Sequence, residues 1–188
     1  MFWSEEERKS FHQKYIINHY LKQYNEEIIS GKKFFNCGEP CVAVCKKVDG
    51  DFKKDYEPYQ TMGPLSGIFD QRAAEKLNHT ADALGFDAIS IGGVISWLFD
   101  CLNDKLLTPD ELGLTGLPKF DPKDFQVVED SALNADLGCQ ILHNMMGQNA
   151  KIPMQEGARK YARHLGRNKG KQIIDKFLYN GFGRKGWM

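Results

Sequence analysis

The stretch from Asp70 to Leu102 reads DQRAAEKLNHTADALGFDAISIGGVISWLFDCL. Asp70 is a typical helix N-cap, and the apolar residues after it recur at helical spacing up to Leu84. Gly85 suits the left-handed position that follows a helix end. A second apolar segment, starting at Asp87 or Ser90, continues to Leu102. The stretch therefore predicts two helices joined by a tight turn.

The rest of the chain favours the same fold class. Further apolar faces with a helical period lie at residues 5–30, 134–146, 154–165 and 171–179, and Thr108-Pro109-Asp110-Glu111 is typical of a helix start. The polar residues 46–56 predict a loop, and residues 115–130, with their glycine and prolines, predict a surface excursion. Strand signals are scarce. We expect one mainly α domain over residues 1–188.

The charges of the chain balance. Its 188 residues include 25 Lys and Arg and 25 Asp and Glu, so no basic footprint for nucleic acid or an anionic membrane is visible. No apolar run reaches the length of a membrane span, and the acidic start carries no signal-peptide core. We expect a cytoplasmic protein that binds neither nucleic acid nor membrane.

Three cysteines stand close together, with the spacing C-x3-C-x3-C at Cys37, Cys41 and Cys45. Without a secretion signal, such a cluster favours a soft metal or an iron–sulfur cluster over disulfides. Pro40 prevents one helix from carrying all three, and irregular backbone suits a cluster. The alternative is that the cysteines are small buried side chains. A four-iron cluster normally takes four thiolates, so a ligand is missing from this run.

Two acidic segments follow the cysteines. Glu57 stands on a predicted loop stiffened by proline and glycine, either as a surface charge or as an acid held in a site. Asp82 and Asp87 flank the predicted turn at Gly85. They are either a helix end followed by an N-cap, or acceptors for the amino groups of a heterocycle.

Two further observations have plainer interpretations. Glu75 and His79 stand four residues apart on a predicted helix, a geometry that can chelate a divalent ion, although a surface pair in solvent is the favoured interpretation. Cys101 lies on an apolar helix and is interpreted as a core residue.

Taken in order, these segments resemble the aldehyde:ferredoxin oxidoreductase family of tungsten-pterin enzymes. The similarity covers residues 30–180 and rests on motifs that share their order along the chain: the cysteine cluster, Tyr56-Glu57 before Gly63-Pro64-x-x-Gly67-Ile68, the D-x-x-G-x-D motif of Asp82 to Asp87, Ile91-Gly92-Gly93, the run from Lys105 to Gly113, Gln155-Glu156-Gly157-Ala158-Arg159, and Ala162-x-x-Leu165-Gly166.

The resemblance implies a role for each motif. Cys37, Cys41 and Cys45 match three ligands of a 4Fe-4S cluster. Glu57 matches a glutamate beside the metal, and Asp82, Gly85 and Asp87 match one of two motifs that hold a bis-pterin with tungsten (or molybdenum). The implied reaction oxidises an aldehyde to a carboxylic acid and passes two electrons to ferredoxin. The implied fold is the helical central domain of such an enzyme, with the start of its C-terminal domain.

The chain also departs from the family pattern. The usual cysteine spacing is C-x2-C-x3-C, one residue shorter than here. The fourth cluster cysteine, the second pterin motif and the N-terminal base domain lie elsewhere in family members, and Cys139 does not match that second motif.

We therefore expect a fragment of a larger enzyme, with an iron–sulfur ligand segment at 30–48, a pterin-site portion at 49–114 and a helical remainder at 115–188. The expected partners are ferredoxin and the remaining domains or a complementary subunit, and a homodimer is a further option. The alternatives are a stand-alone iron–sulfur subunit for electron transfer or assembly, without catalysis, and a helical module without metal.

Overall fold

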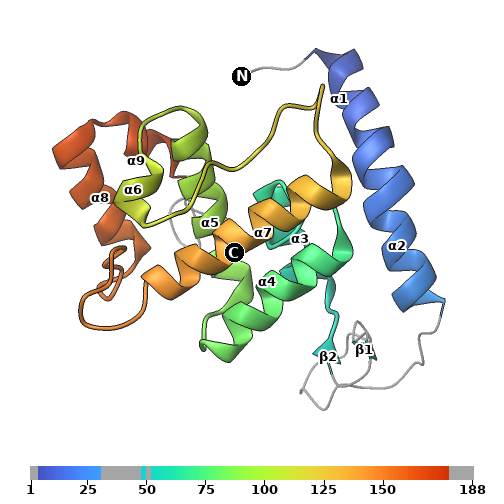
Figure 1. Ribbon diagram of the computed structural model, residues 1–188, viewed down its shortest axis with the longest axis horizontal. Coiled ribbons are helices and arrows are strands. Elements are labelled where there is room, and N and C mark those ends of the chain that lie inside the picture. The colour runs from blue at the N-terminus through green and yellow to red at the C-terminus, as the bar shows by residue number, and fades with distance from the viewer. Residues whose placement is uncertain (1–3, 31–47, 50–51, 178–188) are drawn as a thin grey trace, which may run out of the picture.

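The computed structural model describes residues 4–30, 48–49 and 52–177 (Figure 1). A long N-terminal helix comprises the consecutive elements α1 (Glu5–Phe11), η1 (His12–Leu21), α2 (Lys22–Tyr24) and η2 (Asn25–Ile29). The elements after it are β1 (Val48–Asp49), β2 (Phe52–Lys53), α3 (Tyr56–Thr61), η3 (Pro64–Ser66), α4 (Gln71–Ala83), α5 (Ala88–Asn103), α6 (Pro109–Leu112), α7 (Val127–Asn144), α8 (Ala158–Lys169) and α9 (Gln172–Lys176). The mainly helical fold class is confirmed.

The N-terminal helix begins with a capping box. The backbone N–H of Glu7 donates to the Ser4 hydroxyl at 3.2 Å, and the Glu7 carboxylate accepts from the backbone N–H of Ser4 at 2.8 Å. Over η1 and η2 the helix has the wider π-type hydrogen bonding. It covers one side of the molecule (Figure 1). The prediction of a helix over residues 5–30 is confirmed.

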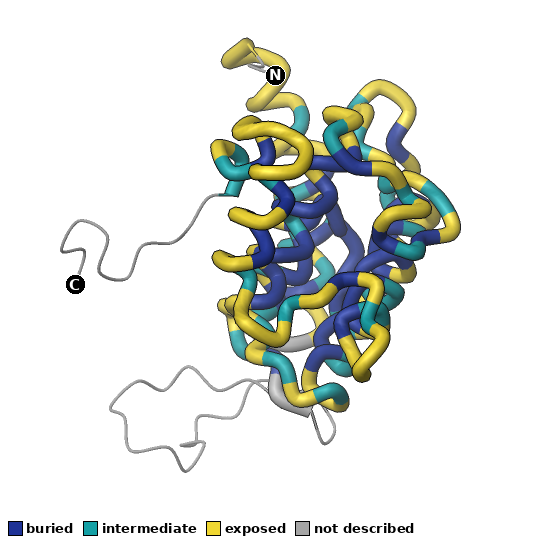
Figure 2. Tube along the Cα trace, turned by 90° about the vertical axis from the view of Figure 1, so that its left-hand side faces the viewer, coloured by how far each residue is buried: buried dark blue, intermediate teal, exposed yellow. Residues whose placement is uncertain are grey.

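The core lies between α4 and α7, which run alongside each other in the same direction, and α5, which packs beside them. Gly138 permits close approach of α7, because a Cβ atom there would stand 3.0 Å from the methyl groups of Leu77 on α4. Buried residues line the inner faces of these helices and exposed residues their outer faces (Figure 2). A second, smaller cluster comprises Tyr15, Phe69 and Phe125, and it joins the N-terminal helix to the core region.

The predicted helix–turn–helix is confirmed. The Asp70 carboxylate accepts from the N–H groups of Arg72 and Ala73 at 3.0 and 3.3 Å and caps α4. Gly85 has φ +78°, the left-handed conformation that favours glycine. Asp87 caps α5 by accepting from the N–H of Ser90 at 2.7 Å.

Between the cysteine run and α4 the sequence-based prediction was wrong. The predicted loop at 46–56 contains a short antiparallel pair, β1 and β2, and Glu57 lies on the helix α3 instead of a loop. Asp55 takes the extended N-cap conformation, and Pro58 stands in the first turn, where the backbone donor that proline lacks has no intrahelical partner.

Three predicted helix boundaries were also wrong. Helix α7 begins at Val127, inside the predicted excursion, because the buried Asp130 carboxylate accepts from the N–H of Gln126 at 2.8 Å. Helix α8 runs from Ala158 to Lys169, so Gly166 lies within it. Helix α9 ends at Lys176, short of the predicted end at residue 179.

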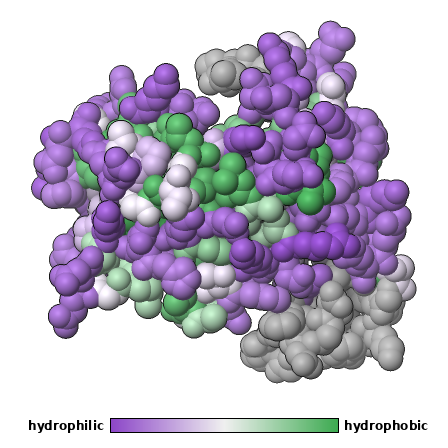
Figure 3. Space-filling view, in the orientation of Figure 1, coloured by the Kyte–Doolittle hydropathy of each residue, from purple (hydrophilic) through white to green (hydrophobic). Residues whose placement is uncertain are grey.

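The surface is mostly hydrophilic. On the face shown in Figure 3, the hydrophobic residues that reach the surface lie mainly in the middle. No single helix among the described residues is both long and apolar enough to cross a membrane. Helices α4 and α5 pass that test only as a pair, with a bend of 116° between them.

Candidate functional site

The predicted cluster ligands Cys37, Cys41 and Cys45 lie outside the described residues. Cys101 is buried, which confirms its interpretation as a core residue, and burial raises the pKa of its thiol to about 12. Cys139 is half-buried and donates to the Thr80 hydroxyl at 3.3 Å. No group of three or more potential metal ligands stands together in the described part of the chain.

The turn between α4 and α5 carries the predicted pterin-binding residues. Asp82 and Asp87 are exposed at its two ends, and a Cβ atom on Gly85 would meet nothing within 4 Å. The backbone N–H of Ser90 is the main cause that lowers the pKa of Asp87. Within the described residues, no hydrogen bond or ion pair engages the Asp82 carboxylate. The turn thus presents two carboxylates around an open glycine.

Helix α3 runs in the same direction as α5, and three contacts show this. The Thr61 hydroxyl donates toward the carbonyl of Ala88 at 3.2 Å, and the Ser66 hydroxyl lies 3.4 Å from the carbonyl of Gly92. One turn further along α5, the Ser96 hydroxyl donates to the Leu65 carbonyl at 2.8 Å. The chain from α3 into η3 therefore follows α5 from its N-terminus onward.

This direction places Glu57 near the turn. Glu57 is exposed in the first turn of α3, one helical turn before Thr61, which is about 5 Å along the axis. Because Thr61 already contacts Ala88, the first residue of α5, Glu57 lies at the end of the α3–α5 pair that carries Asp87. The structure thus brings Glu57 to the end of α5 where the turn of Asp82, Gly85 and Asp87 lies.

Sequence reasoning missed a buried cation that packs against α4. Lys54 is only 2% exposed, and its ammonium group lies 3.3 Å from the Glu75 carboxylate on α4. His79 Nε2 lies 3.9 Å from the same carboxylate. Glu75, His79 and Asp82 are spaced i, i+4 and i+7, so one face of α4 carries them toward the turn.

This arrangement changes the interpretation of Glu75 and His79. Glu75 faces a buried lysine, whereas the sequence favoured a pair in solvent. The i, i+4, i+7 spacing could have indicated this face. Lys54 belonged to the polar stretch predicted as a loop, which gave no signal for burial.

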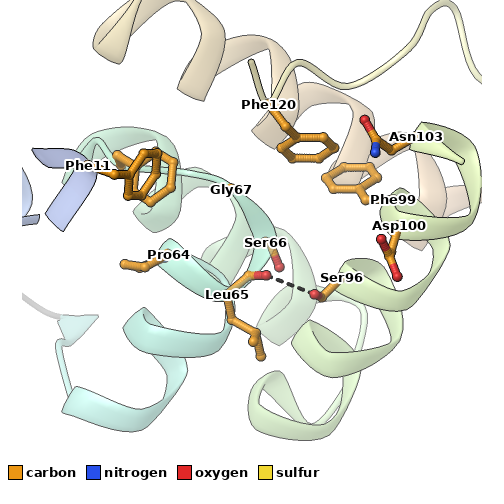
Figure 4. A pocket seen from close by; sticks show the side chains of 11 residues that line it. Phe11, Pro64, Leu65, Ser66, Gly67, Ser96, Phe99, Asp100, Asn103 and Phe120 are labelled. Carbon is orange, nitrogen blue, oxygen red and sulfur yellow. Dashed lines mark hydrogen bonds between the residues drawn. The ribbon is translucent and has the colours of Figure 1, made fainter. Parts of the chain in front are cut away.

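A cavity of about 330 Å³ opens on the other side of η3 (Figure 4). Phenylalanine rings from four elements or connections line it, namely Phe11, Phe69, Phe99 and Phe120. Asp100 and Asn103 lie at one end. The Asp100 carboxylate is already paired with Lys176 at 2.8 Å. The lining includes none of the predicted site residues, so this cavity is distinct from the carboxylate-bearing turn.

Comparison with known proteins gives a family. The family profile described as aldehyde ferredoxin oxidoreductase, domains 2 & 3, matches residues 3–172. An uncharacterized protein of Methanocaldococcus jannaschii is 39% identical over 95% of this chain. The glyceraldehyde-3-phosphate:ferredoxin oxidoreductase of Pyrococcus furiosus is 34% identical over 92% of it. The tungsten-containing aldehyde ferredoxin oxidoreductase of Thermococcus kodakarensis is 28% identical over 67% of it.

These relatives are much longer than the chain. The matched part is 31%, 25% and 22% of their respective lengths. No solved structure matches the chain.

Proposed function

The chain belongs to the aldehyde ferredoxin oxidoreductase family, and from this we propose that it forms the helical central portion of an enzyme that oxidises aldehydes to carboxylic acids. The observation that carries the proposal is the match of residues 3–172 to the family profile. In the reaction, an aldehyde and water give a carboxylic acid, two protons and two electrons, and the electrons pass through a 4Fe-4S cluster to ferredoxin.

The α4–α5 turn fits one side of a pterin. A pterin ring carries amino and ring N–H donors, and Asp82 offers a carboxylate that no described residue engages. One oxygen of Asp87 accepts from Ser90, which orients the carboxylate and leaves its second oxygen for a ligand. Gly85 leaves open space above the turn. Asp82, Gly85 and Asp87 would hold the pterin by these acceptors, and the bound pterin with tungsten (or molybdenum) supplies the redox chemistry.

Glu57 is the proposed acid–base residue. It stands at the turn-bearing end of the α3–α5 pair and is exposed. Its carboxylate would hold the attacking water and accept a proton from it. Glu75 and His79 lie on the face of α4 that leads to the turn, and the buried Lys54 ammonium offsets the charge of the Glu75 carboxylate.

The cluster and the partners complete the proposal. Cys37, Cys41 and Cys45 would supply three thiolates, with the fourth from the remaining domains or a complementary subunit. The segments 30–48, 49–114 and 115–188 would be, respectively, the cluster ligand segment, the pterin-site portion and the helical remainder. The relatives' greater length supports a need for further domains, and a homodimer is a further partner to test.

The cluster is tested on this chain by anaerobic reconstitution with iron and sulfide. We expect the visible charge-transfer absorption of an iron–sulfur cluster, together with bound iron, in the wild-type chain and their loss in Cys41→Ala. Cys139→Ala is the matched control, since Cys139 lies on α7 and donates to the Thr80 hydroxyl, and it should keep both signals. Equal iron in all three chains would contradict the assignment of the ligands.

The pterin site is tested in a full-length relative that carries the D-x-x-G-x-D motif. Replacing the aspartate equivalent to Asp87 by asparagine keeps a helix cap but removes a charge. We expect lower pterin and tungsten content with unchanged helix content by circular dichroism. Unchanged pterin content would make the motif a helix junction only. If the chain binds an iron–sulfur cluster but the aspartate substitution leaves the pterin content unchanged, the alternative of an iron–sulfur electron-transfer or assembly subunit is favoured instead.

A further inference from the structure

We propose that Thr61, Ser66 and Gly92 are positioning residues, and that their contact sets the distance between Glu57 and the Asp87 end of the turn. This inference rests on the proposed function, because it concerns the geometry of the same site. It adds residues that touch neither the pterin nor the substrate in that proposal, and that act by fixing how α3 lies against α5.

Gly92 makes the close approach of the helices possible. A Cβ atom at this position would stand 2.7 Å from the Thr61 Cβ, 2.8 Å from its Oγ1 and 2.9 Å from its backbone carbonyl carbon. Real Cβ atoms essentially never come so near to other heavy atoms, and two of the three atoms are fixed to the backbone of α3. Any larger residue would therefore push α3 away from α5, and Glu57 moves with α3.

Hydroxyl groups hold the helices at this separation. The Thr61 hydroxyl lies within hydrogen-bond reach of the carbonyls of Glu57, Pro58 and Ala88, at 3.3, 3.2 and 3.2 Å. The Ser66 hydroxyl, which is buried, donates to the Thr61 carbonyl at 2.8 Å. One hydroxyl thus connects the backbone of Glu57 to the first residue of α5.

The position of Glu57 explains why this contact matters to the site. Glu57 and Thr61 are i and i+4 neighbours, so they share a face of α3. Asp87 directly precedes Ala88, the residue that Thr61 reaches. A displacement at Thr61 therefore changes the separation between the Glu57 and Asp87 carboxylates with little flexible structure in between.

The chain contains a matched control for the glycine. Gly93 is the next residue of α5, it is exposed, and a Cβ atom on it would meet nothing within 4 Å. Alanine at either position raises the intrinsic helix propensity of α5 equally. Gly92→Ala and Gly93→Ala therefore differ only in the contact with α3.

The test measures the separation directly on this chain. With the native cysteines replaced by alanine, a nitroxide label is attached at Glu57→Cys, and the relaxation of the Asp87 and Ser90 amides is recorded by NMR. We expect strong broadening of these amides in the parent chain and in Gly93→Ala, and its loss or reduction in Gly92→Ala. Urea midpoints should rise for Gly93→Ala and fall for Gly92→Ala.

A purely structural role would lower the urea midpoint of Gly92→Ala and leave the broadening unchanged, and that result overturns the proposal. If Gly92→Ala does not fold, Thr61→Val takes its place, because valine keeps the branched shape and has a methyl group where threonine has the hydroxyl. Unchanged broadening in Thr61→Val would then refute the role of the hydroxyl. The proposed function has its own test. It fails if the aspartate substitution in the full-length relative leaves the pterin content unchanged, and this outcome does not depend on the amide broadening.

Discussion

Replacing Asp70 by alanine should be among the most destabilising single changes in the chain. Asp70 is 4% exposed and accepts four hydrogen bonds: from the backbone of α4 at 3.0 and 3.3 Å, from His19 at 3.0 Å and from Gln23 at 2.8 Å. The lost helix cap costs about 1 kcal/mol. Each part-buried donor left without its acceptor adds about 1 kcal/mol. We expect a loss of about 3 kcal/mol.

Asp87→Ala is the matched control for this prediction. Asp87 caps α5 through the N–H of Ser90 and is exposed, so its loss removes a cap but leaves no buried donor. We expect about 1 kcal/mol there. Urea unfolding followed by circular dichroism gives both values, with unchanged slopes against urea. If Asp70→Ala costs no more than Asp87→Ala, the bonds from His19 and Gln23 contribute nothing and the reasoning is refuted.

The cost of Asp70→Ala should also depend on pH. Burial raises the pKa of Asp70, but hydrogen bonds from Gln23, His19 and the N–H groups of Ala73 and Arg72 outweigh it, so the pKa lies below its ordinary value. The unfolded state then binds the proton more readily, with a pKa of about 3.9. The contribution of Asp70 is therefore complete above that pH and is lost as the pH falls through the folded-state pKa. Urea titrations of both chains at several acidic pH values measure the shrinking difference, and a constant difference would contradict it.

Three other results are expected. Trp97→Phe should cost about 2 kcal/mol in urea unfolding, because it removes the indole N–H that donates to the buried Ile173 carbonyl at 3.0 Å; an unchanged midpoint would contradict this. Cys101, whose thiol pKa burial raises to about 12, should stay unmodified by iodoacetamide in the native chain and react in urea, as peptide mass spectrometry can show. The 188-residue chain by itself should not oxidise aldehydes with ferredoxin or viologen as acceptor, since it matches no more than 31% of the length of the relatives compared; measurable turnover would refute that expectation.

The parts of the fold that could be predicted from the sequence are those that local chemistry determines. Asp70 as a cap and Gly85 at a positive φ are fixed by residues within a few positions of them, and both predictions are confirmed. Gly166 shows the opposite case. Its local signal is a helix stop, but α8 continues through it to Lys169. The glycine is needed for packing instead, because a Cβ atom there would stand 2.4 Å from the Ile174 side chain.

The candidate site divides in the same way. The Asp82–Asp87 turn was visible in the sequence, whereas the placement of Glu57 beside it depends on a contact between Thr61 and Gly92 that no local pattern encodes. The burial of Lys54 likewise depends on its distant partner Glu75. Sequence patterns indicate which residues can do chemistry, and tertiary packing decides which of them meet.

The small aromatic cluster of Tyr15, Phe69 and Phe125 has a consequence for how the molecule opens. It attaches the N-terminal helix to the molecule beside the main core. Among the described residues of this helix, only Tyr20 belongs to the buried main core, and its hydroxyl donates to the carbonyl of Tyr59. Proteins open in cooperative units whose free energies differ, and a helix that contributes little to the main core belongs to the weaker units. Amide protons of residues 5–29 should therefore exchange with solvent through partial opening, while those of α4 and α7 wait for global unfolding.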